Sequence, residues 1–170
     1  THLLGMTVAS ARQHVDNHTF ISHNVARCES NEMFKYVLND QSVGAFAGKV
    51  LVKENCPRTV AYQGNRNIVA SADAKMYSKP QLEIYTDDVK CSHGSATGQL
   101  NEEALFYMRS RGISEAEARQ LLMQAFMSDV IDAVRLPALK DRLHHLVEKR
   151  FRGQLAMCAD CTAANCAAAK

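Results

Sequence analysis

Neither sign of charge dominates this sequence of 170 residues, and none of its apolar runs is long. The formal net charge is only +2 and the basic residues do not cluster, which argues against nucleic acid as the main partner. No apolar run approaches the roughly 20 residues of a membrane span, and no secretory signal opens the chain. Because the chain begins with Thr1 rather than Met, we expect a fragment that lacks an N-terminal part.

The cysteines lack the short, even spacing of a small secreted domain held together by disulfides. Three are far apart, and three lie close together near the C-terminus. They are Cys28, Cys56, Cys91, Cys158, Cys161 and Cys166. We therefore expect reduced thiols in a cytoplasmic protein.

The first part of the chain is rich in short β-like runs but poor in the Asn-Gly and Asp-Gly pairs that mark tight hairpins. Val, Ile, Tyr and Thr recur there, with partial alternation of apolar and polar positions. A β-helix needs no tight hairpins, because each strand passes round a corner to the next face, whereas a sandwich and a barrel remain alternatives. The predicted strand runs are 3–8, 15–21, 35–38, 43–52, 59–63, 68–70 and 82–85. The asparagines expected at corners are Asn24, Asn31, Asn39, Asn65 and Asn67.

After Gly98 the pattern becomes helical. Asn101 is suited to cap a first helix that Gly112 ends. Ser114 begins a capping box for a second helix, and Pro137 is suited to the first turn of a third. The predicted domains are a β core over residues 1–98, a helical domain over 99–153 and a disordered tail over 154–170.

The sequence contains no phosphate-binding loop and no Gly-x-Ser-x-Gly motif, so Cys91 and His93 are its most interesting chemical groups. They lie in segment 90–94, which we predict to be a strand-to-helix junction. Residues two apart on an extended chain share a face. A thiolate and an imidazole placed in this way can ligate soft metals or clusters, or act as nucleophile and base. The spacing alone still favours a buried cysteine and a structural histidine.

Two other groups of residues are weaker candidates. His14 and His18 share a face of an extended chain and His23 does not, so solvated or hydrogen-bonded histidines fit better than a metal site. The tail holds a Cys-x-x-Cys motif, a spacing that suits zinc or a redox pair. No second pair in the tail completes a tetrahedral site. We therefore favour an exposed tail with adventitious metal affinity for Cys158, Cys161 and Cys166.

Residues 80–113 read PQLEIYTDDVKCSHGSATGQLNEEALFYMRSRGI. This segment closely resembles the C-terminal signature of the SufB/SufD family of iron–sulfur cluster assembly proteins, and residues 14–24, 44–52 and 61–67 also look like that family. The Cys-Ser-His-Gly element, followed by Gly-Gln-Leu, resembles the SufD branch, whereas the SufB branch usually has Glu in place of Gly94. Asn101 departs from the aspartate common in that branch, but both residues cap a helix.

The resemblance implies a mainly β fold, a right-handed parallel β-helix, followed by a helical C-terminal domain. It implies a SufB partner bound through the β-helix and the ATPase SufC bound through residues 101–150. His93 matches the family's interface histidine and is the expected metal ligand, with Cys91 as its companion. A transient iron–sulfur cluster is expected at the interface with the partner chain and none in the isolated fragment, which could instead pair with a second copy.

The implied protein is therefore a cytoplasmic scaffold and not an enzyme, with no nucleic acid or membrane among its partners. Two alternatives remain open at this point. One is a transferase or hydrolase that uses Cys91 and His93 as nucleophile and base. The other is a purely structural interaction module without metal chemistry.

Overall fold

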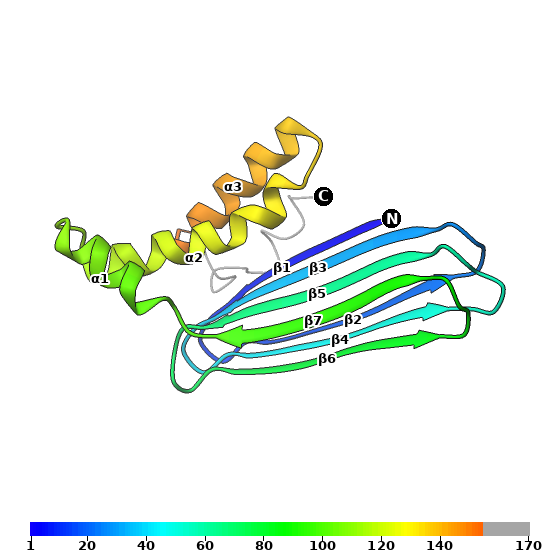
Figure 1. Cartoon of the computed structure of the whole chain (residues 1–170). Helices are drawn as coiled ribbons and strands as arrows, with labels where there is room; N and C mark the ends of the chain where they lie inside the picture. The colour runs from blue at the N-terminus through cyan, green and yellow to red at the C-terminus, as the bar shows by residue number, and fades with distance from the viewer. Residues whose placement is uncertain (155–170) are drawn as a thin grey trace, which may run out of the picture. The chain divides into compact units, whose positions relative to one another are not determined.

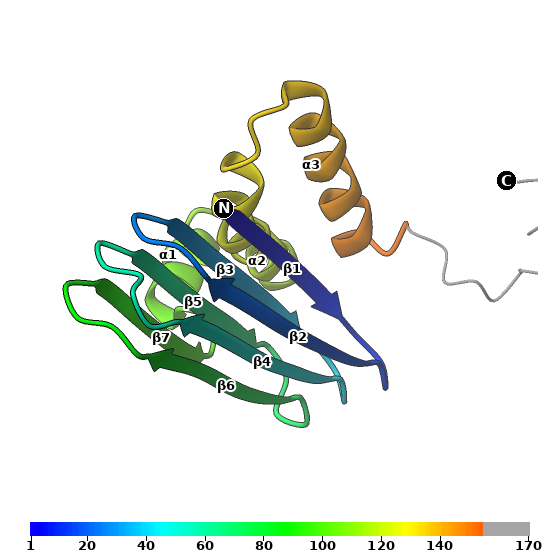
Figure 2. The ribbon, with the colours of Figure 1, turned by 90° about the vertical axis from the view of Figure 1, so that its right-hand side faces the viewer.

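Seven strands, which pair in parallel within two sheets, form the first part of the computed structural model, which describes residues 1–154 (Figure 1). The chain alternates between a four-stranded sheet in the order β1-β3-β5-β7 and a three-stranded sheet in the order β2-β4-β6. Figure 2 shows the two sheets as adjacent layers. The strands are β1 (His2–Ala9), β2 (His14–His23), β3 (Glu29–Leu38), β4 (Val43–Val52), β5 (Val60–Val69), β6 (Lys75–Ile84) and β7 (Lys90–Gly98).

Each coil of the chain contains one strand from each sheet. In the larger sheet His2 pairs with Asn31, Asn31 with Tyr62 and Tyr62 with Ser92, which are steps of 29, 31 and 30 residues. Strands that follow each other in the sequence lie in different sheets, so none of the seven described strands forms a hairpin with the next. The predicted parallel β-helix is therefore confirmed, and the sandwich and barrel alternatives are wrong.

The corners between strands turn through left-handed residues. Six residues other than glycine have φ between 54° and 61°, and all of them lie between strands. They are Ala11, Arg27, Asp40, Asn55, Arg58 and Asp88. Asn24 and Asn39 lie at corners as predicted, but Asn31 lies in β3, and Asn65 and Asn67 lie in β5. The corner prediction is wrong for these three.

Several predicted strand bounds also need correction. The run 35–38 is only the end of β3, and the run 82–85 overlaps only the end of β6. The runs 59–63 and 68–70 belong to one strand, β5, whose polar inward residues hid its continuity. Segment 90–94 is not a strand-to-helix junction, because the chain stays extended to Gly98 and the first helix begins at Glu102. The mostly polar residues of β7 form a strand because all of them, from Lys90 to Gly98, pair with residues of β5.

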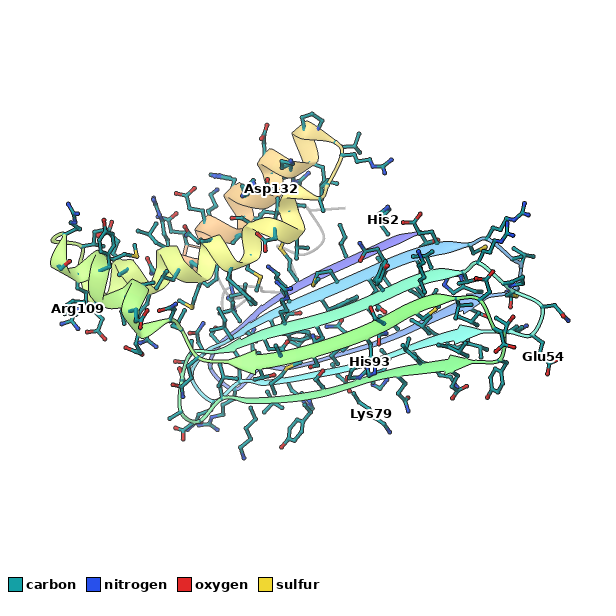
Figure 3. The ribbon with its side chains drawn as sticks, viewed as in Figure 1. His2, Glu54, Lys79, His93, Arg109 and Asp132 are labelled. Atoms are coloured by element: carbon teal, nitrogen blue, oxygen red, sulfur yellow. The ribbon has the colours of Figure 1, made fainter. Side chains whose placement is uncertain are left out.

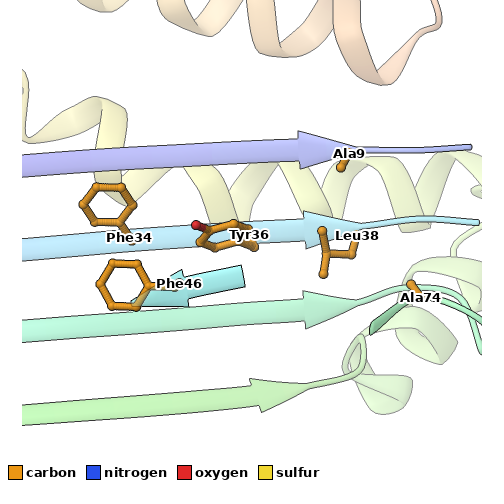
Figure 4. Close-up of a cluster of buried hydrophobic side chains, with 6 residues drawn as sticks. All are labelled: Ala9, Phe34, Tyr36, Leu38, Phe46 and Ala74. Atoms are coloured by element: carbon orange, nitrogen blue, oxygen red, sulfur yellow. The ribbon is translucent and has the colours of Figure 1, made fainter. Parts of the chain in front are cut away.

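The apolar core lies between the two sheets and is made mainly by β3 (Figure 4). Phe34, Tyr36 and Leu38 alternate along β3 and point toward the other sheet, as a period of two requires. The rings of Phe34 and Phe46 lie 5.0 Å apart between centroids, which joins β3 to β4. The hydroxyl of Tyr36 donates to the Ala45 carbonyl at 2.9 Å, so this buried polar atom is satisfied.

The three helices begin where the sequence predicts. They are α1 (Glu102–Ser110), α2 (Glu115–Asp132) and α3 (Pro137–Phe151). Asn101 Oδ1 accepts from the Ala104 amide at 3.0 Å, and Ser114 Oγ accepts from the Glu117 amide at 3.3 Å. These contacts satisfy amides that have no partner within the helix. Gly112, with φ of 87°, follows the end of α1.

The chain divides into two compact units, Thr1–Val130 and a unit that begins at Ile131. In the first unit α2 contacts the larger sheet, because Arg119 donates to the Ala70 carbonyl at 2.7 Å and Lys35 binds two groups of α2. In the second unit Asp132 lies 3.5 Å from Lys140 Nζ. The predicted boundaries 1–98, 99–153 and 154–170 stay predictions.

The predicted tail lies, apart from Gln154, outside the described residues, and so do Cys158, Cys161 and Cys166. Within residues 1–154, no helix combines the length and the apolar character needed to cross a membrane.

Candidate functional site

Cys91 and His93 lie on the inner face of β7, the face toward the smaller sheet. Ser95, two residues beyond His93, shows this directly, because its Oγ donates to Ser78 Oγ of β6 at 2.8 Å. Thr97 Oγ1 accepts from Asn67 at 3.0 Å on the same side. Since residues two apart on a strand share a face, Cys91 and His93 point the same way as these two residues. The predicted shared face of Cys91 and His93 is therefore present.

These inner-face residues are nevertheless accessible from outside. β7 is the last strand of the larger sheet and β6 the last strand of the smaller one, and no strand of the described chain pairs with their outer edges. We call the end formed by β6 and β7 the open end. His93 is exposed and Cys91 is half-buried, although Gln63, the register partner of His93 on β5, is only 3% exposed. Figure 3 labels His93 along β7.

The thiol of Cys91 is not activated. Burial raises the pKa of the Cys91 thiol above its ordinary value of 9.0, and a backbone hydrogen bond at Ala61 offsets only part of that effect. A nucleophilic cysteine needs the opposite shift, because the thiolate is the reactive form. The site offers a soft thiol and an imidazole on one face, which are donor types that iron–sulfur clusters and soft metals accept.

The interior next to the open end is polar. Asn65 Oδ1 accepts from Asn67 Nδ2 and from Ser78 Oγ, each at 2.7 Å, and more weakly from Ser95 Oγ at 3.4 Å. This network joins the two sheets, since Ser78 lies on β6 and the other residues lie on β5 and β7. The end of the β-helix is thus held together by hydrogen bonds rather than by an apolar plug.

A second pair of buried polar side chains, Gln63 and Glu32, lies beside this network, since Gln63 is two residues before Asn65 on β5. The sequence did not indicate this pair. Gln63 Nε2 donates to Glu32 Oε2 at 2.8 Å, and Glu32 has no exposed surface. The register places Glu32 beside Gln63 and Gln63 beside His93. Glu32 and Gln63 are 31 residues apart in the sequence, and Gln63 and His93 are 30 apart. These spacings indicate spatial neighbours only when the number of residues in one coil is already known.

The histidine candidates from the sequence do not form a site within residues 1–154. His14 and His18 are exposed on β2, and His18 Nε2 lies 3.1 Å from Asp16 Oδ1. His23 is buried and bonds Ser30 Oγ at 2.9 Å. The prediction of solvated or hydrogen-bonded histidines on a β surface fits His14 and His18, whereas His23 is hydrogen-bonded but buried. No group of three or more His, Cys, Asp or Glu side chains within residues 1–154 is arranged to hold a metal ion.

Comparison with known proteins identifies the family. Residues 1–126 match the family model described as "SUF system FeS cluster assembly, SufBD core domain". An iron–sulfur cluster assembly SufBD family protein of Synechocystis is 39% identical over 88% of this chain and 33% of the relative. The iron–sulfur cluster assembly protein SufD of Escherichia coli is 36% identical over 81% of this chain and 33% of its own length.

A SufBD family protein of Mycobacterium leprae is 35% identical over 86% of this chain and 39% of its own length. The chain thus spans about a third of the length of the curated relatives it matches. The matched region covers the whole β-helix and reaches into α2. The chain belongs to the SufB/SufD family of iron–sulfur cluster assembly proteins, on its SufD branch.

Proposed function

We propose that this chain is a scaffold component of iron–sulfur cluster assembly by the SUF system, and that it has no catalytic activity of its own. The observation that carries the proposal is the open end, where His93 and Cys91 face the interior of the β-helix yet remain accessible. His93 supplies an imidazole ligand to iron or to a nascent cluster, and Cys91 supplies a second donor beside it. The cluster is cargo, held transiently and passed on.

The proposed site is half of a site, completed by a SufB chain. Within residues 1–154 no strand pairs with the outer edges of β6 and β7, and such edges favour the addition of strands from a partner. A partner that stacks on the open end would cover His93 and place its own ligands opposite. In the absence of SufB, a second copy of this chain could use the same edges and form a homodimer.

Residues 101–150 are proposed to bind the ATPase SufC. Part of the support is on α1, where Phe106 and Tyr107 expose 74% and 59% of their surface. Adjacent aromatic side chains that stay in water are typical of a surface that a partner protein covers. Changing Phe106 to Asp should weaken capture of SufC while the open end still binds SufB, and equal capture by the variant would contradict this assignment. The compartment proposed for the complex is the cytoplasm.

The decisive experiment is His93→Ala in the complex with SufB and SufC. Iron and acid-labile sulfide bound after reconstitution should fall strongly, while the amounts of SufB and SufC that copurify stay unchanged. Ser92→Ala is the matched control, because Ser92 is exposed but lies on the opposite face of β7. Normal cluster content in the His93 variant would remove the site from the proposal, and loss in both variants would point to a general defect of β7.

The raised pKa of the Cys91 thiol disfavours the alternative of a transferase or hydrolase. The purely structural alternative predicts that iron retention by the complex does not depend on His93. The reconstitution with His93→Ala therefore distinguishes a purely structural module from a scaffold whose His93 binds the cluster.

A further inference from the structure

His93 ends a row of inner-face residues that crosses the larger sheet. Register pairs join Leu3 to Glu32, Glu32 to Gln63 and Gln63 to His93, so these four positions stand side by side on β1, β3, β5 and β7. Neighbouring strands lie roughly 4.8 Å apart, a distance that a glutamine side chain spans. The row thus leads from a buried carboxylate to the exposed imidazole of the proposed site.

The Gln63 amide is held in one orientation. The amide NH₂ of Gln63 donates to Glu32 Oε2 at 2.8 Å, so the amide nitrogen faces the carboxyl group and the amide oxygen faces away from it. The opposite sheet also confines the amide, because a Cβ at Gly48 would lie 2.5 Å from Gln63 Nε2 and 2.6 Å from the Phe46 ring. Gly48 therefore leaves the space that the amide fills.

This orientation leaves Gln63 Oε1 as an acceptor with no hydrogen-bond partner among the residues that the structure describes. Glu32 Oε1 is in the same condition. Buried acceptors without partners are costly, and burying a carboxylate costs more. A purely structural core would favour apolar residues here, as it does at Phe34, two residues after Glu32 on the same face. The two oxygens therefore need a hydrogen-bond donor, which a ligand, a neighbouring side chain or a water could supply.

The His93 ring is exposed and makes no hydrogen bond to Gln63 in the structure. We propose that this ring turns inward to its register neighbour Gln63, whose amide Glu32 fixes, and that Gln63 Oε1 then accepts the N–H of one imidazole nitrogen. The proposal rests on the proposed role of His93 as a metal ligand. Histidines that bind metals usually donate their other ring N–H to a carbonyl or carboxylate, which fixes the tautomer and the ring orientation. Gln63 leaves the second imidazole nitrogen unprotonated and directed to the open end, and Glu32 keeps the amide from turning.

The test reads the tautomer of His93 and needs no iron. The purified chain is labelled with ¹⁵N-histidine and studied by NMR at about pH 8, where an ordinary imidazole is neutral. The His93 signals are assigned by their loss in His93→Asn. We expect one dominant tautomer in the unaltered chain and a mixture close to that of free imidazole in Gln63→Leu. The matched control is Gln81→Leu on the exposed face of β6, which should leave the tautomer unchanged.

A folded Gln63→Leu variant with the tautomer ratio of the unaltered chain would overturn the proposal, and it would leave a buried water as the partner of these oxygens. If Gln63→Leu does not fold, Glu32→Gln replaces it, because that change keeps the volume and frees the amide to turn. A shift of the tautomer ratio toward the mixture supports the proposal, and an unchanged ratio overturns it.

A second readout follows iron in the reconstituted complex. Loss of an outer partner of a ligating histidine typically lowers metal affinity about 10- to 100-fold, so Gln63→Leu should weaken iron binding less than His93→Ala. If His93→Ala leaves cluster assembly intact while Gln63→Leu still changes the tautomer, the proposed function fails and the positioning contact stands. If His93→Ala abolishes assembly but Gln63→Leu leaves the tautomer ratio of His93 unchanged, the proposed contact with Gln63 is wrong and the proposed function stands.

Discussion

Lys35 and Asp129, 94 residues apart, form an ion pair in which only the lysine is buried. The Lys35 side chain is 2% exposed and its Nζ lies 2.7 Å from Asp129 Oδ2, whereas Asp129 is 71% exposed. The same ammonium donates to the Phe126 carbonyl at 2.7 Å and lies 4.5 Å from the centre of the Phe126 ring. β3 thus holds α2 by one charged group inserted beneath the helix.

Removing the carboxylate should loosen this attachment. Asp129→Ala leaves the buried ammonium with fewer acceptors, and we expect the free energy of unfolding to fall by about 1–2 kcal/mol. Lys35→Met, which removes the charge and keeps most of the length, should cost less than Lys35→Ala. Urea unfolding followed by circular dichroism measures all three. Asp141→Ala, an exposed change on α3, is the control, and equal stability of Asp129→Ala and that control would contradict the prediction.

Gly48 and Gly94 should respond differently to alanine. A Cβ at Gly48 would lie 2.5 Å from Gln63 Nε2 and 2.9 Å from Thr19 Oγ1, so Gly48→Ala should destabilise the β-helix by about 1–3 kcal/mol. A Cβ at Gly94 meets nothing within 4 Å, so Gly94→Ala should change stability by less than about 0.5 kcal/mol. Thermal unfolding of both variants tests this. If Gly48→Ala unfolds at the same midpoint temperature as Gly94→Ala, the interior around Gly48 can expand to accept a methyl group.

Cys91 should be a slow thiol. Because burial raises the pKa of the Cys91 thiol, the thiolate fraction at about pH 8 is smaller than in a free cysteine peptide. We expect iodoacetamide to modify Cys91 more slowly than that peptide, with the rate rising to the peptide value in urea. Mass spectrometry of the peptide that contains Cys91 measures the rate, and Cys91→Ser identifies its signal. A native rate above that of the peptide would revive the enzyme alternative.

His23 should make stability depend on pH. Desolvation by burial lowers the pKa of His23 below 6.5. The unfolded chain therefore binds a proton at a higher pH than the folded chain does. The stabilisation from neutral His23 is complete above about pH 6.5 and is lost as the pH falls from there toward the folded pKa.

The measurement is urea unfolding of the unaltered chain and of His23→Gln between about pH 5 and pH 8, the range in which an ordinary histidine titrates. The slope of stability against pH should be smaller in His23→Gln. His18→Gln is the comparison variant, because it makes the same change in a 73% exposed side chain on the same strand. An equal slope in all three proteins would assign the pH dependence to other groups.

The sequence allowed prediction of β4 in full and of β3 and β6 only near their C-terminal ends, and no strand run was predicted over β7. β4 alternates buried and half-buried residues along its whole length, and its predicted bounds agree with the structure. β7 contains mostly small and polar residues, and it is a strand because β5 supplies its hydrogen-bond partners. A pattern based on hydrophobic residues cannot detect a strand whose conformation is imposed by its neighbour.

The same distinction applies to the site. Cys91 and His93 could be selected from the sequence because they lie two residues apart, and their shared face follows from local geometry. Glu32 and Gln63 could not be selected, because they approach His93 only through a coil length that the corners determine. The accessibility of an inner-face histidine likewise depends on which strands end the two sheets, which no local pattern reports.

The attachment of α2 also has a consequence for cooperativity. In a solenoid each coil contacts only its neighbours, so the coils can unfold one after another from an end, as in a one-dimensional array of coupled units. Here Lys35 links α2 to the coil of β3, while Arg119 of the same helix binds the carbonyl of Ala70, beyond β5. The helix adds a second connection between the adjacent coils of β3 and β5, which also pair directly. Unfolding of these coils from the open end is therefore opposed by an element that follows them in the sequence.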